Sequence, residues 1–298
     1  MLDVPASRPA ASYGEALERI AAFCALDDGS ILPRARSYVL QHGARSPLAV
    51  VLLHGITNHP GQYVSLAPLL HERGHNVFVP RLPEHGDVNR MTTRLKSLTA
   101  ERLLASANEA LDIACGLGER VCILGISTSG LLCAYFAQYR ADVARAVPVN
   151  PVFGMLHIPY EVNEMIEKIL LTLPNFFVWW DPRNKENQLP STGYPRFSTR
   201  ALMQCLRIGN DVHHRAKESP IRAKSIFVIT NRLDPAVNND VTSQVVKQWR
   251  IKRGSGIETF EFTNLPKNHD IIDPENAAPR LDLVYPKLLE VVDGTPGA

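Results

Sequence analysis

The stretch Val121–Leu132 limits the possible folds of this chain more than any other feature. Four apolar residues lead into Gly125, Ser127 follows two positions later, and an apolar pattern with helical period comes next. This order is typical of a strand, a very sharp turn and a helix, with the serine hydroxyl exposed at the apex of the turn. The free backbone N–H groups at the start of such a helix can stabilise an oxyanion. A nucleophilic serine is therefore the prediction, with a serine that only caps the helix as the alternative.

The residues beside Ser127 fit this turn to different degrees. Side chains two positions before and after the serine would collide with the neighbouring backbone, so both positions need small residues. Gly125 satisfies this requirement fully, whereas Ser129 replaces the second glycine of the usual G-x-S-x-G pattern. We expect Ser129 to tighten the turn or to alter its packing.

Strand-like and helix-like segments alternate through most of the chain. The continuous apolar run 48–53 is typical of a strand that is buried on both faces of a parallel sheet. Further strands are expected at 37–41, 76–80, 121–124, 144–149, 225–230 and 258–262, and helices at 13–26, 63–73, 99–117, 129–139, 198–216, 240–252 and 277–292. This alternation predicts an α/β fold with a doubly wound, mostly parallel sheet.

The alternation stops between residues 151 and 224, an interval longer than an ordinary crossover needs. We expect residues 151–215 to form an inserted helical cap (lid), and residues 1–150 and 216–298 to form the core. Apolar pockets are mostly lined by hydrophobic side chains. Candidates for a substrate pocket are Thr57, in the turn after the strand 48–53, and the cap residues Phe176, Phe177, Trp179 and Trp180. The four aromatic residues would also fit a cap core.

Two more polar residues stand directly after predicted strands. Asp234 follows the strand 225–230, and His269 follows the strand 258–262. Ligands of open α/β sheets bind at the carboxyl ends of the strands, which is also where Ser127 lies. A serine hydroxyl needs a neutral imidazole to take its proton, and a carboxylate to orient that imidazole. We predict these roles for His269 and Asp234, with nearby carboxylates as alternatives to Asp234, namely Asp240, Asp270 and Asp273.

The turn that begins at His54 follows the strand 48–53 and supplies the last part of the predicted site. An oxyanion needs two N–H donors. A turn in this position can direct the Ile56 N–H toward the serine, where the Thr128 N–H would be the second donor. His54 itself is interpreted as a structural residue, because His269 already occupies the position of the base.

Taken together, these motifs resemble the α/β-hydrolase superfamily and, within it, the carboxylesterase and monoacylglycerol-lipase-like branch. The similarity covers most of the chain outside the cap, through His54–Thr57, Arg81–Gly86, the turn at Ser127, Asp234 with Pro235 and Val237, and His269. The resemblance implies a catalytic triad of Ser127, Asp234 and His269, an oxyanion hole formed by Ile56 and Thr128, and a mobile helical cap. The family commonly has glycine at three positions where this chain has Glu84, Ser129 and Asn231.

The predicted reaction is the hydrolysis of carboxylic esters, with formation and cleavage of an acyl-enzyme. The apolar cap suggests small-molecule esters with short to medium acyl chains. Other chemistries use the same fold and triad, so a C–C bond hydrolase, an amidase and an acyltransferase remain alternatives. A protein that kept the triad but only binds a small ligand, with slow turnover, is a further alternative from a different class.

Composition and charge exclude several other classes. The chain carries 32 basic and 30 acidic residues without a dense Lys/Arg block, so nucleic-acid binding is not expected. Its five cysteines lack C-x-x-C spacing, which favours reduced thiols and a cytoplasmic location and argues against structural zinc. We expect no cofactor and no metal, and interpret His213–His214 as a solvated helix end. Neither a signal peptide nor a membrane-spanning run is recognisable, and the sequence does not indicate the oligomeric state.

Overall fold

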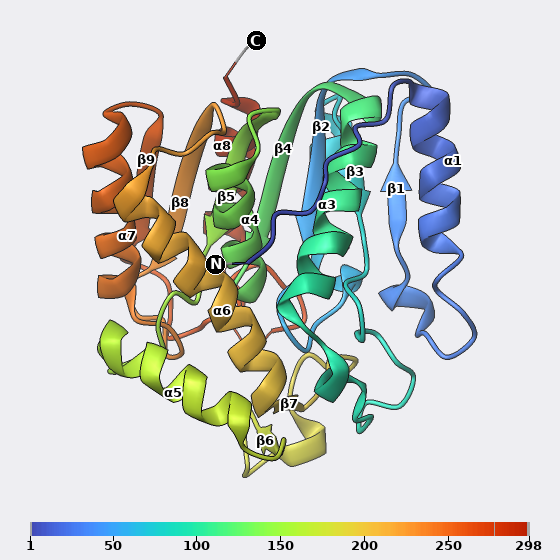
Figure 1. The fold of residues 1–298 in the computed structure, drawn as a ribbon. Helices are drawn as coiled ribbons and strands as arrows, with labels where there is room; N and C mark the ends of the chain where they lie inside the picture. Colours follow the sequence, from blue (N-terminus) through green and yellow to red (C-terminus); the bar gives the residue numbers. More distant parts are fainter. Residues whose placement is uncertain (1, 277, 297–298) are drawn as a thin grey trace.

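A single seven-stranded sheet forms the centre of the computed structural model, which describes residues 2–276 and 278–296 (Figure 1). Its strands are β1 (Tyr38–Leu40), β2 (Ser46–Leu53), β3 (Asn76–Val79), β4 (Gly118–Ile126), β5 (Val143–Val149), β8 (Ser225–Asn231) and β9 (Ile257–Phe262). Their spatial order is β1-β3-β2-β4-β5-β8-β9, and β1 alone runs antiparallel to its neighbour. The predicted doubly wound, mostly parallel sheet is confirmed.

Strand β2 shows why the buried strands appear as continuous apolar runs. Its side chains alternate between two apolar layers, one containing Leu48, Val50 and Leu52 and the other containing Ala49, Val51 and Leu53. Both layers are covered by helices, so neither face of the strand needs polar residues.

Two sets of helices cover the sheet. One face is covered by α2 (Leu66–Glu72) and α8 (Leu281–Asp293), and the other by α1 (Tyr13–Cys24), α3 (Ala100–Leu117), α4 (Thr128–Tyr139), α6 (Thr199–Glu218) and α7 (Asn239–Arg253). Several helix starts follow from capping residues. The Ser12 and Thr99 side chains accept the N–H groups of Glu15 and Arg102, so α1 and α3 begin directly after them.

Two predicted helices differ from those observed. The predicted helix 63–73 is a short 3₁₀ turn, Pro60–Tyr63, followed by α2, and the His59 side chain caps that turn by accepting the Gly61 N–H. The predicted helix 277–292 starts at a residue outside the described ones, and the observed α8 begins at Leu281. Pro279 explains the late start, because the residue before a proline disfavours helical angles; Ala278 has a φ of 54°.

The segment between β5 and α6 lies beyond the end of the sheet at which β5 leaves it (Figure 1). It contains α5 (Tyr160–Thr172) and a small antiparallel hairpin of β6 (Phe177–Trp179) and β7 (Arg196–Ser198). Helix α6 packs against α5 on one side and against α4 and α7 of the core on the other. The predicted cap boundary at residue 215 therefore falls inside a helix that contacts both parts.

Candidate active site

The sharp turn between β4 and α4 is built around Ser127. This residue has a φ of 60° and a ψ of −119°, in a region that side-chain-bearing residues seldom adopt. A Cβ on Gly125 would lie 2.6 Å from the Ser129 carbonyl oxygen, which explains why a glycine is needed there. The Ser129 hydroxyl donates to the carbonyl of His54. This departure from the usual pattern therefore ties the serine turn to the turn after β2.

The three residues predicted as a triad lie together at the carboxyl ends of β4, β8 and β9. His269 Nε2 is 2.8 Å from Ser127 Oγ, and His269 Nδ1 is 2.7 Å from Asp234 Oδ2. An ionised carboxylate only accepts hydrogen bonds, so Nδ1 carries the proton and Nε2 is free to accept the serine hydroxyl. This is the arrangement in which an imidazole can deprotonate a serine as it attacks.

The environment of His269 favours its protonated form. Burial of the ring opposes the charge, but the Asp234 carboxylate and its hydrogen bond outweigh burial, and the Asp270 charge adds to them; together they raise the pKa of His269. The Asp234 side chain has no exposed surface, and its Oδ1 accepts the N–H groups of Ala236 and Val237 at 2.8 and 3.1 Å. The carboxylate is thus held in place by its own loop as it orients His269.

Two asparagines position the loop that carries His269. The Asn150 side chain donates to the His269 carbonyl at 2.8 Å and accepts the Asn231 N–H at 2.7 Å. The Asn231 side chain in turn donates to the carbonyls of Pro266 and Asn268. The sequence analysis assigned neither residue a role, although each stands at the end of an apolar strand run, where the functional residues also lie.

The turn after β2 brings Ile56 beside the serine turn. The Ile56 N–H donates to Thr128 Oγ1 at 3.0 Å, so the predicted oxyanion donor already has an acceptor in this structure. The Thr128 hydroxyl is a contact that the sequence analysis did not anticipate. The two predicted oxyanion donors therefore lie on neighbouring elements: the Ile56 N–H in the turn after β2, and the Thr128 N–H in the first turn of α4.

His54 links two backbone segments and lies apart from the serine. Its side chain is fully buried, with Nε2 accepting the Leu82 N–H at 3.0 Å and Nδ1 donating to the Gly55 carbonyl at 2.9 Å. Burial, together with the neighbouring His85, holds the pKa of His54 well below its ordinary value. A neutral ring with both nitrogens bonded to backbone supports the structural interpretation of this residue.

A cavity of about 600 Å³ reaches Ser127 and His269. Of the five predicted substrate-binding residues, Thr57 and Trp180 line it and Phe176, Phe177 and Trp179 do not. The rings of Phe177 and Trp179 face the Arg196 guanidinium, at 4.7 and 6.0 Å, and Phe176 is half exposed. Alternation along β6 places Phe177 and Trp179 on the same side of the hairpin, toward Arg196.

The cavity has both apolar and polar lining residues. The apolar lining includes Met155, Leu189, Pro190, Phe197 and Leu202. Its polar lining includes Asn58, Gln62 and Asp270; the Gln62 side chain donates to Asp270 at 2.6 Å, and the Asn58 side chain donates to Asp273 at 2.8 Å. Burial and the nearby Asp270 charge raise the pKa of Asp273 to about 6. Asp270 and Asp273, considered above as alternatives to Asp234, thus accept hydrogen bonds from side chains that follow β2.

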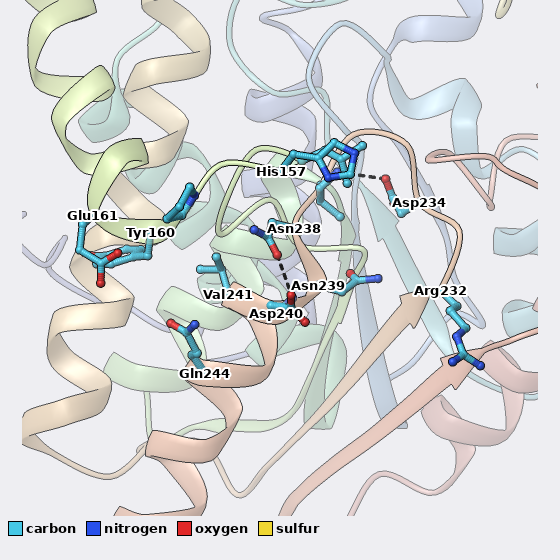
Figure 2. A pocket seen from close by; sticks show the side chains of 13 residues that line it. His157, Tyr160, Glu161, Arg232, Asp234, Asn238, Asn239, Asp240, Val241 and Gln244 are labelled. Atoms are coloured by element: carbon cyan, nitrogen blue, oxygen red, sulfur yellow. Dashed lines mark hydrogen bonds between the residues drawn. The ribbon is translucent and has the colours of Figure 1, made fainter.

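A second pocket, of about 520 Å³, is lined by Asp234 and by the first residues of α5 and α7 (Figure 2). Its lining includes Tyr160 and Glu161 from α5 and Asn239 and Asp240 from α7, but neither Ser127 nor His269. Among residues 2–276 and 278–296, no group of three or more His, Cys, Asp and Glu side chains is placed to hold a metal ion.

The interpretation of His213 as part of a solvated helix end is wrong. Helix α6 continues to Glu218, and the His213 ring is buried against Tyr160, with 3.7 Å between the ring centroids. Burial lowers the pKa of His213 to about 4. His214, by contrast, is partly exposed and lies 3.5 Å from Glu164.

Comparison with known proteins identifies the family of this chain. The model of the alpha/beta hydrolase family matches residues 50–252, more than half of the chain, so this protein belongs to that family. A thermostable monoacylglycerol lipase from a Bacillus species is 28% identical over 239 residues, which cover 78% of this chain and 90% of the lipase.

Solved structures show the same fold. One described for the metagenome-derived lipolytic enzymes LipS and LipT has a TM-score of 0.68 and 19% identity, covering 88% of this chain and 99% of that one. The monoacylglycerol lipase of Paleococcus ferrophilus has a TM-score of 0.67 and 18% identity, and the match covers 87% of this chain and 99% of that one. At 18–19% sequence identity, these structural matches show a shared fold and nothing about activity.

Proposed function

We propose that this protein is a serine carboxylic ester hydrolase that acts through Ser127, His269 and Asp234 and forms an acyl-enzyme. The observation that carries the proposal is the continuous hydrogen-bond chain from Asp234 through His269 to Ser127, beside a cavity of about 600 Å³. The lipase and esterase activities named for its relatives support an ester hydrolase.

The chemistry follows from the proton positions. Ser127 Oγ attacks the ester carbonyl as His269 Nε2 takes its proton, and His269 then gives that proton to the leaving alcohol. A water molecule, deprotonated by the same nitrogen, cleaves the acyl-enzyme and regenerates Ser127. Asp234 keeps His269 in the required tautomer and stabilises the imidazolium in both steps.

The backbone N–H groups of Ile56 and Thr128 are the proposed oxyanion donors. The bond from the Ile56 N–H to the Thr128 hydroxyl is compatible with this role, because a charged oxygen is a stronger acceptor than a hydroxyl and competes for the same donor. Removal of one such donor costs about 100- to 1,000-fold in turnover in other serine hydrolases.

The proposed substrates are esters of short to medium acyl chains, including monoacylglycerol-like molecules. The apolar lining residues suit an acyl chain, and the polar lining residues Gln62 and Asp270 suit an alcohol with further hydroxyl groups. The name of the Bacillus relative supports this substrate class.

Two broader expectations belong to the same proposal. Residues 151–215 act as the cap, because Trp180 and other residues of this segment form one wall of the cavity. A cytoplasmic location is proposed from the five free cysteines. No helix in the described part of the chain is long and apolar enough to cross a membrane.

The test combines covalent labelling with turnover. Wild-type protein and Ser127→Ala are incubated with a fluorophosphonate and their intact masses measured, and both are assayed on p-nitrophenyl esters of increasing chain length. We expect one label per wild-type chain, none on Ser127→Ala, and a fall in turnover of about 10⁶-fold in the variant. A Ser127→Ala protein that keeps wild-type turnover would refute the proposal.

The same experiment separates the alternatives. A labelled wild type with a burst of acylation but no steady turnover would indicate a slow, ligand-binding protein. Preferential transfer of the acyl group to an added alcohol would indicate an acyltransferase. Faster cleavage of an anilide than of the matched ester would indicate an amidase.

A further inference from the structure

Thr57 occupies a turn position that normally belongs to glycine. The Asn58 N–H donates to the Gly55 carbonyl at 3.2 Å and so closes a four-residue turn with Ile56 and Thr57 at its centre. Thr57 has a φ of 69°, as the third residue of a type II turn does, and that position favours glycine. A β-branched residue with positive φ is a strained outlier.

The contacts that hold Thr57 come largely from the cap. Its Oγ1 accepts the Trp180 indole N–H at 2.9 Å, and its carbonyl accepts the Tyr194 N–H at 2.8 Å. The same Oγ1 donates to the Ile56 carbonyl. Strained conformations persist where the surroundings over-determine them. Here two of the three restraining partners, Trp180 and Tyr194, belong to the segment 151–215.

The conformation of Thr57 bears directly on Ile56. If Thr57 relaxed to a negative φ, the turn would become type I, in which the peptide between the two central residues is turned over. That change would reverse the Ile56 carbonyl, break its bond with Thr57 Oγ1, and displace the backbone that presents the Ile56 N–H. The Trp180 ring packs against Phe197, with 4.3 Å between ring centroids, and its N–H reaches Thr57.

We infer that Thr57 and Trp180 are positioning residues that couple the cap to the oxyanion hole. The indole N–H holds Thr57 in its strained conformation, and Ile56 is aligned for catalysis only while that bond is present. The inference rests on the proposed function and adds a role for the cap beyond forming a wall of the cavity.

Three substitutions distinguish strain from simple loss of a hydrogen bond. Thr57→Val keeps the β-branch, and hence the strain, but loses the bond to Trp180. Thr57→Gly loses the same bond but also removes the strain, because glycine adopts positive φ freely. Thr57→Ser keeps the hydroxyl and serves as the conservative rescue. If the coupling exists, Thr57→Val lowers kcat about 100-fold, as for a lost oxyanion donor, with little change in KM.

The decisive comparison is between the two variants that lack the hydroxyl. We expect kcat of Thr57→Gly to exceed that of Thr57→Val at least about tenfold, because only the valine variant relaxes out of the turn. Trp180→Phe should lower kcat in the wild-type background more than in the Thr57→Gly background. Trp179→Phe is the matched control, and it should lower kcat less than Trp180→Phe, since Trp179 does not contact Thr57 or line the cavity.

Thermal unfolding of every variant checks that each is folded, and kcat and KM are measured on one p-nitrophenyl ester. Equal losses in Thr57→Gly and Thr57→Val, or no loss in either, would overturn the coupling. Either result leaves the proposed function intact, provided that wild-type protein is labelled at Ser127 and turns over. A wild type without label or turnover defeats the proposed function and the coupling together.

Discussion

The turn at Ser127 and the segment 151–198 differ in how their side chains are held. Around the serine, Gly125 and Ser129 are packed with no room to move, and Ser129 has no exposed surface. In the segment 151–198, Met165, Ile169 and Trp180 are 54%, 49% and 44% exposed. The proposed reacting groups therefore lie in loops that follow strands of the buried sheet, whereas the wall of the pocket depends on a few contacts from an irregular segment.

The difference indicates a division of labour within the molecule. Groups that transfer protons need fixed geometry, because a misplacement of about 1 Å can cost about 100-fold in rate. A segment that shapes a pocket can tolerate looser packing. The bond from Trp180 to Thr57 is where the two regions meet.

Asp234→Asn should have the largest effect among these variants. An asparagine cannot stabilise the imidazolium and favours the wrong tautomer of His269, so kcat should fall about 10⁴-fold. The pKa of His269 should fall as well, because the Asp234 carboxylate is its largest raising influence. Ester turnover across a pH series checks both effects. A loss below tenfold would contradict the assignment of Asp234 as the orienting acid.

How far the sequence predicted this site depends on the kind of constraint. The proximity of Ser127, Asp234 and His269 was predictable because Ser127 and Asp234 follow apolar strand runs, His269 follows the last strand, and parallel strands end at one edge of the sheet. The residues that line the pocket were not predictable in the same way. Apart from the short strand β6, the cap is irregular between α5 and β7, and residue type alone did not distinguish Trp180 from Trp179 or from Phe177. Contacts such as Asn150 to His269 depend on loop geometry that local patterns do not encode.

Asn150→Gly probes the supports of the rigid region. Glycine tolerates the φ of 41° at this position, so the substitution removes only the bonds to His269 and Asn231. The buried Asn231 N–H loses its acceptor, which should cost about 1–3 kcal/mol of unfolding free energy. Turnover should fall about 10- to 100-fold as the His269 loop shifts. Denaturant unfolding and kcat measure the two effects, and unchanged turnover would show that the loop needs no support from Asn150.

Ile208→Ala and Ile169→Ala compare a buried residue of α6 with a half-exposed residue of α5, in the segment 151–198. Ile208 has no exposed surface, so its truncation should cost about 2–5 kcal/mol. Ile169 is half exposed, and its truncation should change stability by less than about 0.5 kcal/mol. Urea unfolding of the two variants gives the comparison. Equal costs would mean that the segment 151–198 is packed as tightly as the buried side of α6, and the looser packing of that segment would not hold.

Asp270→Asn should produce the smallest effect, a shift in pH dependence. His269 must be neutral to accept the serine proton, so activity rises with pH through its raised pKa. Removal of the Asp270 charge lowers that pKa, and the acid limb of kcat/KM should therefore move to lower pH, by less than in Asp234→Asn. Asp273, with a pKa of about 6, also titrates in the pH range of the acid limb. Asp273→Asn is therefore the control that separates its titration from that of His269. The rate of fluorophosphonate labelling should follow the same limb, because it depends on the same neutral imidazole. A limb that stays in place or moves to higher pH would mean that Asp270 acts on the turn after β2, through Gln62, and not on His269.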